Sequence, residues 1–405
     1  MATSERVGLP TAHQVAGWLE SDRLARPGRL GRLRERLARE GVDAYFGLNR
    51  ENTRYLTGFI LAEGEEKHAG QSGQFFVGPD EVVVLADARY TIQAREQCPE
   101  ARIEAVYRDL PTRWPELVAG LADASGPVHR LGVEAVYISH ATWTRLTEAE
   151  PAVELVPVEG WVEELRAVKE PSEVERIEAA CSVADAALER LLPAIGPGVT
   201  EAELALALEW EIRTNGAEAL AFDVACLGGE RAALPHGKPT DRPIRAGEVL
   251  LFDFGAQVGG YRSDMTRTLF VGEPDPDDLA VYRLVAEAQN AALAALDEAA
   301  RRGEPPTNRA IDSVAREVIA GAGHADHFGH GLGHGIGLAT HELPTLGQRA
   351  PESPLPSPTV FSVEPGVYLD GDTGVRIEDL VLFDPDARRL ERLTRFPRDA
   401  VVVGG

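Results

Sequence analysis

Two acidic residues interrupt an apolar stretch in the middle of this sequence, residues 249–271. The stretch reads as two strands joined by the turn pair Gly259-Gly260, which favours an antiparallel hairpin. Pairing the two arms about the middle of the loop places Asp253 opposite Asp264. A lone carboxylate is costly in a core, and two facing carboxylates also repel each other. The pattern therefore predicts a positive group between them, and a divalent metal ion is the favoured candidate.

The same arrangement recurs near the C-terminus, where two strand-like runs flank a turn at Gly371. Folding this second hairpin about Gly371 places Glu364 opposite Glu378. A glycine-rich stretch with two histidines, His330–Gly337, lies between the two hairpins in the sequence. Four carboxylates and one imidazole suit a pair of Mn²⁺-like ions better than a metal that prefers thiolates. We therefore expect both hairpins to contribute to one metal centre.

The length and charge of the chain limit the other functions that it could have. At 405 residues it can form two domains with separate cores. Its formal net charge of −24 and its pI near 4.9 argue against nucleic acids and anionic membranes as partners. We find no apolar run of membrane-spanning length and no signal-peptide core in the sequence, so we expect a cytoplasmic protein.

The three cysteines, Cys98, Cys181 and Cys226, are far apart and form no CxxC motif. A disulfide framework and a thiolate zinc site are therefore disfavoured, and a reducing cytoplasm fits. Cys226 could be a catalytic thiol, but a small buried apolar residue is the favoured interpretation.

The rest of the pattern predicts the elements that must position these residues. Strand-like and helix-like segments alternate before residue 165, which is typical of a small α/β domain. The predicted strands there cover residues 42–47, 75–77, 81–86, 130–136 and 153–158, and the predicted helices cover residues 29–40 and 89–96. After residue 165, long helices interleave with the two hairpins. Two of them begin at expected capping boxes, Ser172–Glu175 and Thr200–Glu203, and two more cover residues 277–301 and 307–320.

We therefore predict an α+β protein with two domains. Residues 1–164 would form the smaller N-terminal α/β domain. Residues 165–405 would form the catalytic domain, a curved antiparallel sheet covered by helices.

The five expected ligands stand in short motifs: Asp253 in DFG, Asp264 in SDMTRT, His334 in GHGIGLATHE, Glu364 in SVEPG and Glu378 in VRIED. In this order the motifs resemble those of the pita-bread metallopeptidases, the family of methionine aminopeptidase, aminopeptidase P and prolidase. The resemblance covers roughly residues 165–400. It continues in RYLTGF and ADARYTIQA, which resemble a creatinase/prolidase-type N-terminal domain. It implies the pita-bread fold and a peptidase with two divalent metal ions.

The resemblance also implies a role for each ligand. Asp253 would chelate one ion, and His334 and Glu364 would complete the coordination of the other. Asp264 and Glu378 would bridge the two ions, which activate water and polarise the scissile carbonyl. Glu364 is also the candidate for moving a proton to the leaving nitrogen. Mn²⁺ is favoured, with Co²⁺ and Zn²⁺ as alternatives.

Three further histidines resemble substrate-handling residues of the family. His236 and His341 would stabilise the oxyanion or hold the substrate, and His330 would line the proline side of the pocket. His324 and His327 have no supporting motif, and we interpret both as structural.

Arg376 lies two residues before Glu378 and therefore shares its face of the strand. We expect it to pair with Asp253 and to orient that carboxylate, as part of the catalytic set. Thr266 holds the corresponding place beside Asp264.

The N-terminal domain and the motif ALPHGKPTDR favour an Xaa-Pro peptidase over methionine aminopeptidase. Two features bear on which Xaa-Pro peptidase this is. Thr345 stands where many prolidases carry arginine, which favours aminopeptidase P acting on longer peptides. The polar stretch Ala62–Gln74 could close over the site and limit substrates to two residues, which favours the Xaa-Pro dipeptidase, prolidase. We take the dipeptidase as the prediction and aminopeptidase P as the alternative.

Two other classes compete with the peptidase. One is creatinase-like hydrolysis without metal, and the other is a non-catalytic pita-bread binding module. The complete set of five ligands argues against both. The resemblance further implies a homodimer, with proline-containing di- or oligopeptides as substrates.

Overall fold

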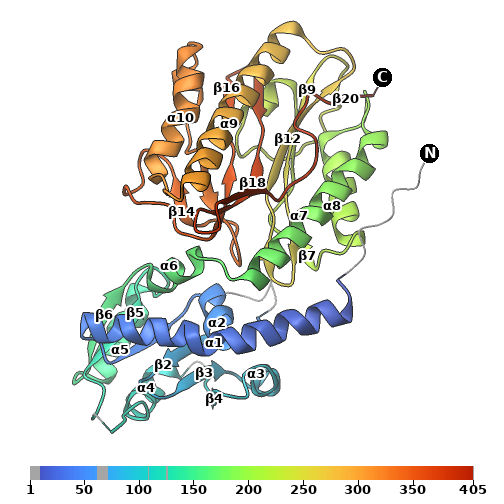
Figure 1. Ribbon diagram of the computed structural model, residues 1–405. Coiled ribbons are helices and arrows are strands. Elements are labelled where there is room, and N and C mark those ends of the chain that lie inside the picture. Colours follow the sequence, from blue (N-terminus) through green and yellow to red (C-terminus); the bar gives the residue numbers. More distant parts are fainter. Residues whose placement is uncertain (1–9, 62–71, 108, 125, 405) are drawn as a thin grey trace. The chain divides into compact units, whose positions relative to one another are not determined.

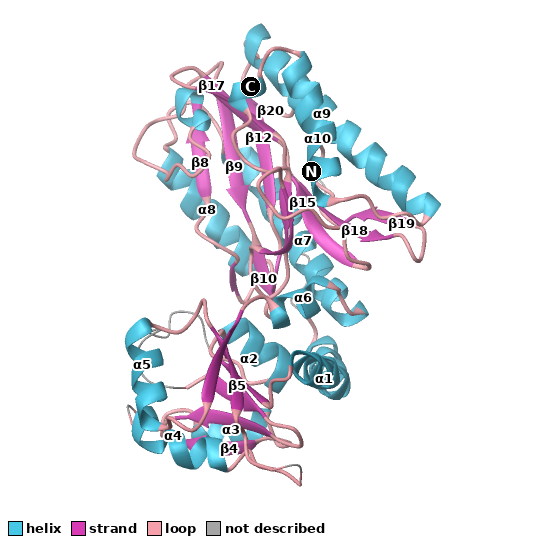
Figure 2. Ribbon diagram, turned by 90° about the vertical axis from the view of Figure 1, so that its left-hand side faces the viewer, coloured by secondary structure: helices cyan, strands magenta, loops and turns pink. Residues whose placement is uncertain are grey.

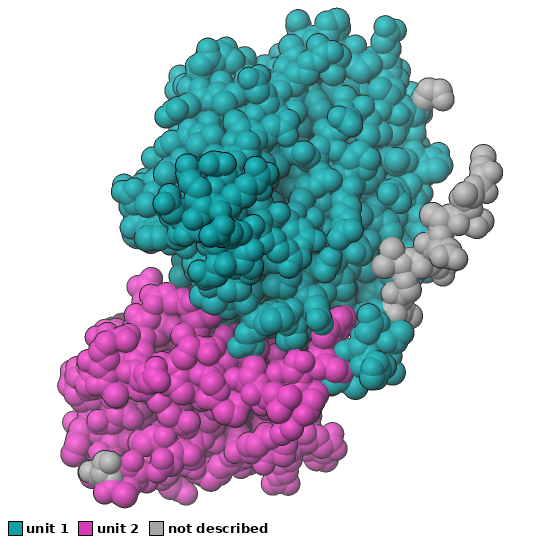
Figure 3. Space-filling view, in the orientation of Figure 1, with its two compact units in different colours: residues 1–16, 166–405 teal, residues 17–165 magenta. Residues whose placement is uncertain are grey.

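The computed structural model describes residues 10–61, 72–107, 109–124 and 126–404. The chain divides into two compact units (Figure 3). The N-terminal unit comprises residues 17–165, and the C-terminal unit comprises residues 1–16 and 166–405. Among the described residues, no helix combines the length and apolar character that crossing a membrane requires.

The described residues of the N-terminal unit form a six-stranded sheet with the strand order β4-β3-β2-β1-β5-β6, and Figure 2 shows this sheet with helices around it. The strands are β1 (Ala44–Gly47), β2 (Gln74–Val77), β3 (Val82–Ala86), β4 (Arg102–Ala105), β5 (Arg130–Glu134) and β6 (Glu154–Val158). The pairs β1–β2 and β2–β3 are antiparallel, and the other neighbours are parallel. Every residue of β1 and β3 is buried, which shows that both faces of the sheet are covered. The expected α/β character of this part is confirmed.

The helices of this unit are α1 (Ala12–Glu40), α2 (Arg50–Thr57), α3 (Thr91–Gln97), α4 (Leu110–Ala119), α5 (His140–Ala149) and α6 (Trp161–Ala167). Helix α1 begins well before the predicted start at residue 29 and runs through Pro27. Trp18 on one side of that proline and Leu33 on the other are both buried, so tertiary packing outweighs the local signal for a break. We did not predict β4, α4 or α5. The residues of β4 are half-buried or exposed at a sheet edge, so they carry no apolar pattern.

In its described residues, the C-terminal unit contains four long helices and short sheets that are antiparallel except for the parallel pair β12–β20. The helices are α7 (Pro171–Leu191), α8 (Glu201–Thr214), α9 (Pro276–Arg302) and α10 (Asn308–Gly321). The strands are β7 (Ala219–Leu220), β8 (Ala225–Gly228), β9 (Val249–Phe254), β10 (Ala256–Val258), β11 (Tyr261–Arg262), β12 (Met265–Val271), β13 (Gly333–Gly335), β14 (Glu342–Leu346), β15 (Thr359–Val363), β16 (Gly366–Leu369), β17 (Thr373–Arg376), β18 (Asp379–Asp384), β19 (Arg389–Arg392) and β20 (Val402–Val403).

Two sheets carry the site: one has the order β20-β12-β9-β8 and the other the order β14-β13-β15-β18-β19. Helices α9 and α10 lie side by side and pack on the strands (Figure 1). One apolar core joins these helices to both sheets; it includes Val285, Leu296, Phe361 and Phe383. The predicted α+β class, with helices covering an antiparallel sheet, is confirmed.

The two predicted capping boxes have different outcomes. At α8, Thr200 Oγ1 accepts from the Glu203 backbone N–H at 3.2 Å, and the Glu203 carboxylate accepts from the Thr200 N–H at 2.9 Å, as expected. The predicted box at Ser172–Glu175 is wrong. The cap of α7 is Glu170, whose N–H donates to Glu173 at 2.8 Å. Pro171 suits the first helical position because it has no N–H to satisfy, so the cap is Glu170, two residues before the predicted Ser172.

Candidate metal centre

The first hairpin has a register that differs from the predicted one. Asp253 on β9 faces Thr266 on β12, rather than Asp264. The hairpin closes at the two-residue turn Gly259-Gly260, where both residues have positive φ, +56° and +83°. This turn matches the twist of paired strands, and it moves the pairing by two residues from the middle of the loop. Because side chains alternate along a strand, a shift of two residues keeps Asp264 on the face of Asp253.

The second hairpin has the predicted register. The pairs Val363–Asp379 and Gly366–Arg376 lie on either side of Glu364 and Glu378, which are therefore opposite each other. Between these pairs the two strands separate and bond to other neighbours. The Glu364 N–H donates to Leu332 O at 2.8 Å, and the Glu378 N–H donates to Thr266 O at 3.1 Å. The gap therefore joins the second hairpin to the strands that carry the remaining ligands.

Three of the five expected ligands meet at one point. Atoms of Asp264, His334 and Glu378 lie within 4.8 Å of one another. His334 Nε2 lies 3.6 Å from Asp264 Oδ2 and 3.3 Å from Glu364 Oε1. His334 Nδ1 lies 3.1 Å from Gly335 O, a contact that assigns the proton to Nδ1 and leaves the Nε2 lone pair facing the acids. Burial lowers the pKa of His334, which favours the neutral imidazole that binds metals.

The carboxylates of this cluster destabilise one another. Burial, followed by the charge of Glu378, raises the pKa of Asp264 well above its usual range. Burial, followed by the charge of Glu364, does the same for Glu378. Buried carboxylates that repel each other require a compensating positive charge.

Arg376 supplies part of that charge and confirms the expected pair with Asp253, with Nη2 2.6 Å from Oδ2. Its Nε donates to Thr266 Oγ1 at 2.8 Å, and Thr266 Oγ1 donates to Glu378 Oε2 at 2.7 Å. One oxygen of each carboxylate is thereby held. The other oxygens, Asp253 Oδ1 and Glu378 Oε1, are buried and have no hydrogen-bond partner among the described residues. Such oxygens are costly unless a cation binds them, so these donors fit a divalent metal.

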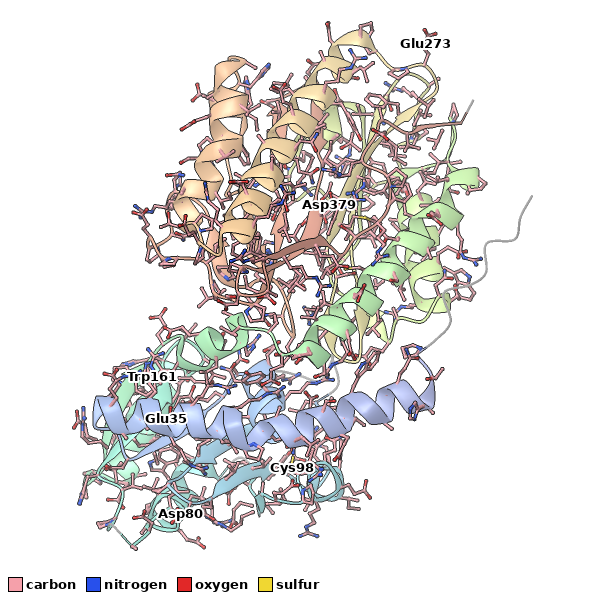
Figure 4. The ribbon with its side chains drawn as sticks, viewed as in Figure 1. Glu35, Asp80, Cys98, Trp161, Glu273 and Asp379 are labelled. Carbon is pink, nitrogen blue, oxygen red and sulfur yellow. The ribbon has the colours of Figure 1, made fainter. Side chains whose placement is uncertain are left out.

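A second buried network fixes the backbone of Glu378. Asp379, labelled in Figure 4, accepts from Arg267 Nη2 at 2.7 Å and from Gln289 Nε2 of α9 at 2.9 Å. Arg267 Nη1 donates to Glu378 O at 2.5 Å and to Thr266 O at 2.9 Å. The network therefore holds β12 and the start of β18 together behind the ligands.

His330 bonds to the protein through both ring nitrogens. Nδ1 lies 2.8 Å from Gly331 O, and Nε2 lies 2.9 Å from the hydroxyl of Tyr368, which accepts from Arg376 Nη1 at 2.8 Å. The ring can therefore offer its flat apolar surface to a substrate rather than a hydrogen bond. Sequence reasoning missed Tyr368. Its position four residues after Glu364 on the same strand face is the signal that could have identified it.

The two other expected histidines lie near this cluster. The ring of His341 packs on the ring of His334, with centroids 4.2 Å apart. Burial, then the charge of His334, lowers the pKa of His341, and the charge of His236 contributes in the same direction. His236 itself is exposed. His324 and His327 contact each other instead, with their Nδ1 atoms 3.1 Å apart.

Three other sequence features have structural outcomes. Cys98, Cys181 and Cys226 are free and buried, and burial raises the pKa of the Cys226 thiol well above its usual range, which disfavours a nucleophilic thiolate. Thr345 is exposed and lies opposite His334 in the pairing of β13 with β14. Residues 62–71 of the stretch Ala62–Gln74, which we expected to close over the site, lie outside the described residues.

Comparison with known proteins identifies related sequences and structures. Residues 175–385 match the model of metallopeptidase family M24, and residues 29–168 match the creatinase/prolidase N-terminal domain. An Xaa-Pro dipeptidase of Pyrococcus furiosus is 38% identical over 269 residues, which cover 66% of this chain and 74% of that protein.

Two solved structures resemble the whole chain. An Xaa-Pro dipeptidase from Bacillus anthracis matches with a TM-score of 0.82 and 32% identity, over 93% of this chain and 99% of that one. An X-Pro aminopeptidase from Thermotoga maritima matches with a TM-score of 0.79 and 33% identity, over 92% and 99%.

Proposed function

This chain belongs to metallopeptidase family M24 and is a prolidase-type peptidase with the pita-bread fold, and from this premise we propose that it hydrolyses Xaa-Pro dipeptides. The observation that carries the proposal is a pair of buried oxygens, on Asp253 and Glu378, that have no hydrogen-bond partner in the described part of the chain and lie beside the cluster of Asp264, His334 and Glu364. With divalent ions bound, this set of donors would concentrate positive charge where a peptide carbonyl would bind. That arrangement suits a hydrolase.

We propose that the site holds two divalent ions, with Mn²⁺ favoured and Co²⁺ or Zn²⁺ as alternatives. Carboxylates with one imidazole are the donor set that such ions accept. Asp253 would hold one ion, His334 and Glu364 the other, and Asp264 and Glu378 would bridge them. When bound, the ions would supply the charge that activates water and polarises the scissile carbonyl.

The side chains of this protein would supply orientation and proton transfer. Glu364 is our candidate for carrying a proton to the leaving nitrogen, and burial raises its pKa, which favours that role. His341 and His236 would donate to the developing oxyanion. His330 would face the proline ring, and Arg376 would hold Asp253 in place.

The alternative function is aminopeptidase P activity on longer peptides. It is favoured by Thr345, because a dipeptide leaves a carboxylate that needs a cation, and this position offers none. Arg376 is already bonded to Asp253, Thr266 and Tyr368. Arg349 and Lys238 are both exposed and remain candidates for that cation.

A matched peptide series decides between the two activities. The Mn²⁺-loaded protein should cleave an Xaa-Pro dipeptide with a higher kcat/KM than the Xaa-Pro-Yaa tripeptide with the same first two residues, and it should leave the Xaa-Ala dipeptide intact. A preference for the tripeptide would make the protein an aminopeptidase P. Failure to cleave either proline peptide would reject the proposed activity.

We also expect only the trans form of the Xaa-Pro bond to be cleaved, because the two isomers direct the substrate amine differently. About 10–30% of such bonds are cis in short peptides, and they isomerise over tens to hundreds of seconds. At high enzyme concentration, stopped-flow traces should show a fast phase and then a slow phase, and a prolyl isomerase should remove the slow phase. A single fast phase that runs to completion without isomerase would contradict this expectation.

Metal content tests the two rival classes. A creatinase-like or non-catalytic protein should contain little metal, whereas our proposal expects about two ions per chain. We further propose a cytoplasmic homodimer that acts on proline-containing peptides, without nucleic-acid or membrane partners. The three free, buried cysteines and the net charge of −24 support this setting.

A further inference from the structure

The segment that carries His341 is anchored by a buried ion cluster. Glu342, the next residue, accepts from Arg166 Nη2 and from Lys169 Nζ, the latter at 3.2 Å. All three side chains are buried, with exposures of 3%, 4% and 0% for Glu342, Arg166 and Lys169. Burial alone would raise the pKa of Glu342, but the two cations outweigh it and hold the pKa at about 2. The carboxylate therefore stays charged and paired.

The same carboxylate holds the loop between the metal ligand His334 and His341. The Ala339 N–H donates to Glu342 Oε1 at 2.8 Å. A Cβ on Gly337 would lie 2.8 Å from Glu342 Oε2, so the loop passes too close to the carboxylate for any side chain there. Glu342 therefore contacts the middle of this loop, two residues before His341, whose ring packs on the ring of His334.

His236 lies on a different loop, which has its own buried anchor. Glu201, on the first turn of α8, is fully buried and accepts from the N–H of Gly228 at 2.9 Å and from the N–H and hydroxyl of Thr240 at 3.0 and 2.8 Å. Arg231 Nε lies 3.0 Å from Glu201 Oε2, and Arg231 Nη2 donates to Lys238 O at 2.6 Å. One carboxylate therefore joins the beginning and the end of the loop, with His236 between them.

Each anchor is built on a buried carboxylate paired with at least one cation. A buried ion pair is costly to desolvate and is often no more stabilising than apolar packing, whereas it does fix a unique geometry. Glu342 directly follows His341, and Glu201 bonds to Gly228 and Thr240 on either side of His236, whereas neither anchor includes a candidate metal ligand. We propose that Glu342, held by Arg166 and Lys169, is a positioning residue for His341, and that Glu201, with Arg231, is a positioning residue for His236.

This inference rests on the proposed function, because it assumes that both histidines act on the oxyanion. Crossed double-mutant cycles test it. Lys169→Met should lower kcat by about ten- to a hundredfold, since small displacements of a catalytic group cost this much, with little change in KM or metal content. In a His341→Ala background the same change should have no further effect, whereas in a His236→Ala background its full effect should remain.

Arg231→Met should show the opposite pattern. Its effect on kcat should disappear in the His236→Ala background and persist in the His341→Ala background. Arg29→Met is the matched control, since Arg29 is a buried cation of the N-terminal unit that pairs with Asp22 at 3.1 Å. It should lower the melting temperature without changing kcat at a temperature where the protein is folded.

The inference is overturned if the effects on kcat are additive when each of Lys169→Met and Arg231→Met is combined with each histidine variant. It is also overturned if Lys169→Met or Arg231→Met loses metal. Either result would mean that both anchors are structural ion pairs only. If Lys169→Met does not fold, Glu342→Gln, which keeps the volume and removes the charge, replaces it in the cycle.

Hydrogen exchange separates this inference from the proposed function. Glu342→Gln should speed exchange at residues 337–341 and leave residues 228–240 unchanged, whatever the substrate. Exchange could respond in this way while His341→Ala and His236→Ala keep full kcat. In that case the proposed roles of the two histidines are wrong. Glu342 and Glu201 then only hold their loops, and their assignment as positioning residues for catalysis is overturned. Unchanged exchange at residues 337–341 would overturn the anchor itself.

Discussion

Replacing Asp264 with alanine is expected to abolish hydrolysis of Xaa-Pro peptides and to remove at least one divalent ion per chain. Asp264 lies with His334 and Glu378 where three ligand atoms converge, and it is our candidate for a bridging ligand. The neighbouring carboxylates Asp253, Glu364 and Glu378 already have ligand roles of their own in the proposal, so none of them is left to take the place of Asp264. Elemental analysis after dialysis, together with kcat/KM, tests the expectation. An active, fully metallated variant would reject the two-metal assignment.

The isosteric change Asp264→Asn should also change the melting temperature relative to the wild type, upward in the metal-free protein and downward in the Mn²⁺-loaded protein. Without metal the charge of Asp264 is unfavourable because of its burial and its repulsion by Glu378, so the variant should melt above the wild type. With Mn²⁺ the wild type should gain stability by ligand binding, and the variant should gain little. Asp185→Asn is the control: Asp185 is buried and accepts from two backbone N–H groups at 2.7 and 2.9 Å, so its loss should destabilise both forms and keep the metal.

Replacing His341 or His236 with alanine is expected to lower kcat by about 10²–10³ and to leave the metal content unchanged. That is the typical cost of losing one oxyanion donor. The packing of His341 on His334 brings it close to a ligand without making it one, since His334 Nε2 faces the acids. Steady-state kinetics and elemental analysis on the same preparations measure both quantities.

His324→Ala is the matched control for the two histidine variants. His324 contacts His327 and, among the described residues, none of the candidate metal ligands, so its loss should leave kcat unchanged. If His341→Ala or His236→Ala loses metal, that histidine is a ligand and its assignment to the substrate is wrong. If the control loses as much activity as either variant, the loss does not report an oxyanion donor.

Local rules account for much of the fold and the ligand set. The alternation of apolar residues with acids predicted the strands of both hairpins. Asp253 lies on β9, whereas Glu364 and Glu378 lie in the gaps between β15 and β16 and between β17 and β18, and the turn at Gly371 was sufficient to place them opposite each other. The first hairpin was placed correctly but with the wrong register, because the two-glycine turn, and not the length of the loop, sets the pairing. The error in register did not change the face on which the candidate ligands Asp253 and Asp264 lie, because the register differs by two residues and side chains alternate with that period.

The sequence by itself was sufficient to nominate the candidate metal ligands, because strand alternation and turn chemistry act over a few neighbours and need no distant contact. The pair of Arg376 with Asp253 was also expected, from the strand face that Arg376 shares with Glu378. The tertiary structure alone decided what holds the segment of His341, because Arg166 and Lys169 reach Glu342 across 176 and 173 residues of chain. Such pairs leave no periodic signal, because the partners are chosen by how sheets and helices pack. Each buried pair is important for the fold, because a charged side chain that is removed from water is costly unless an opposite charge is paired with it.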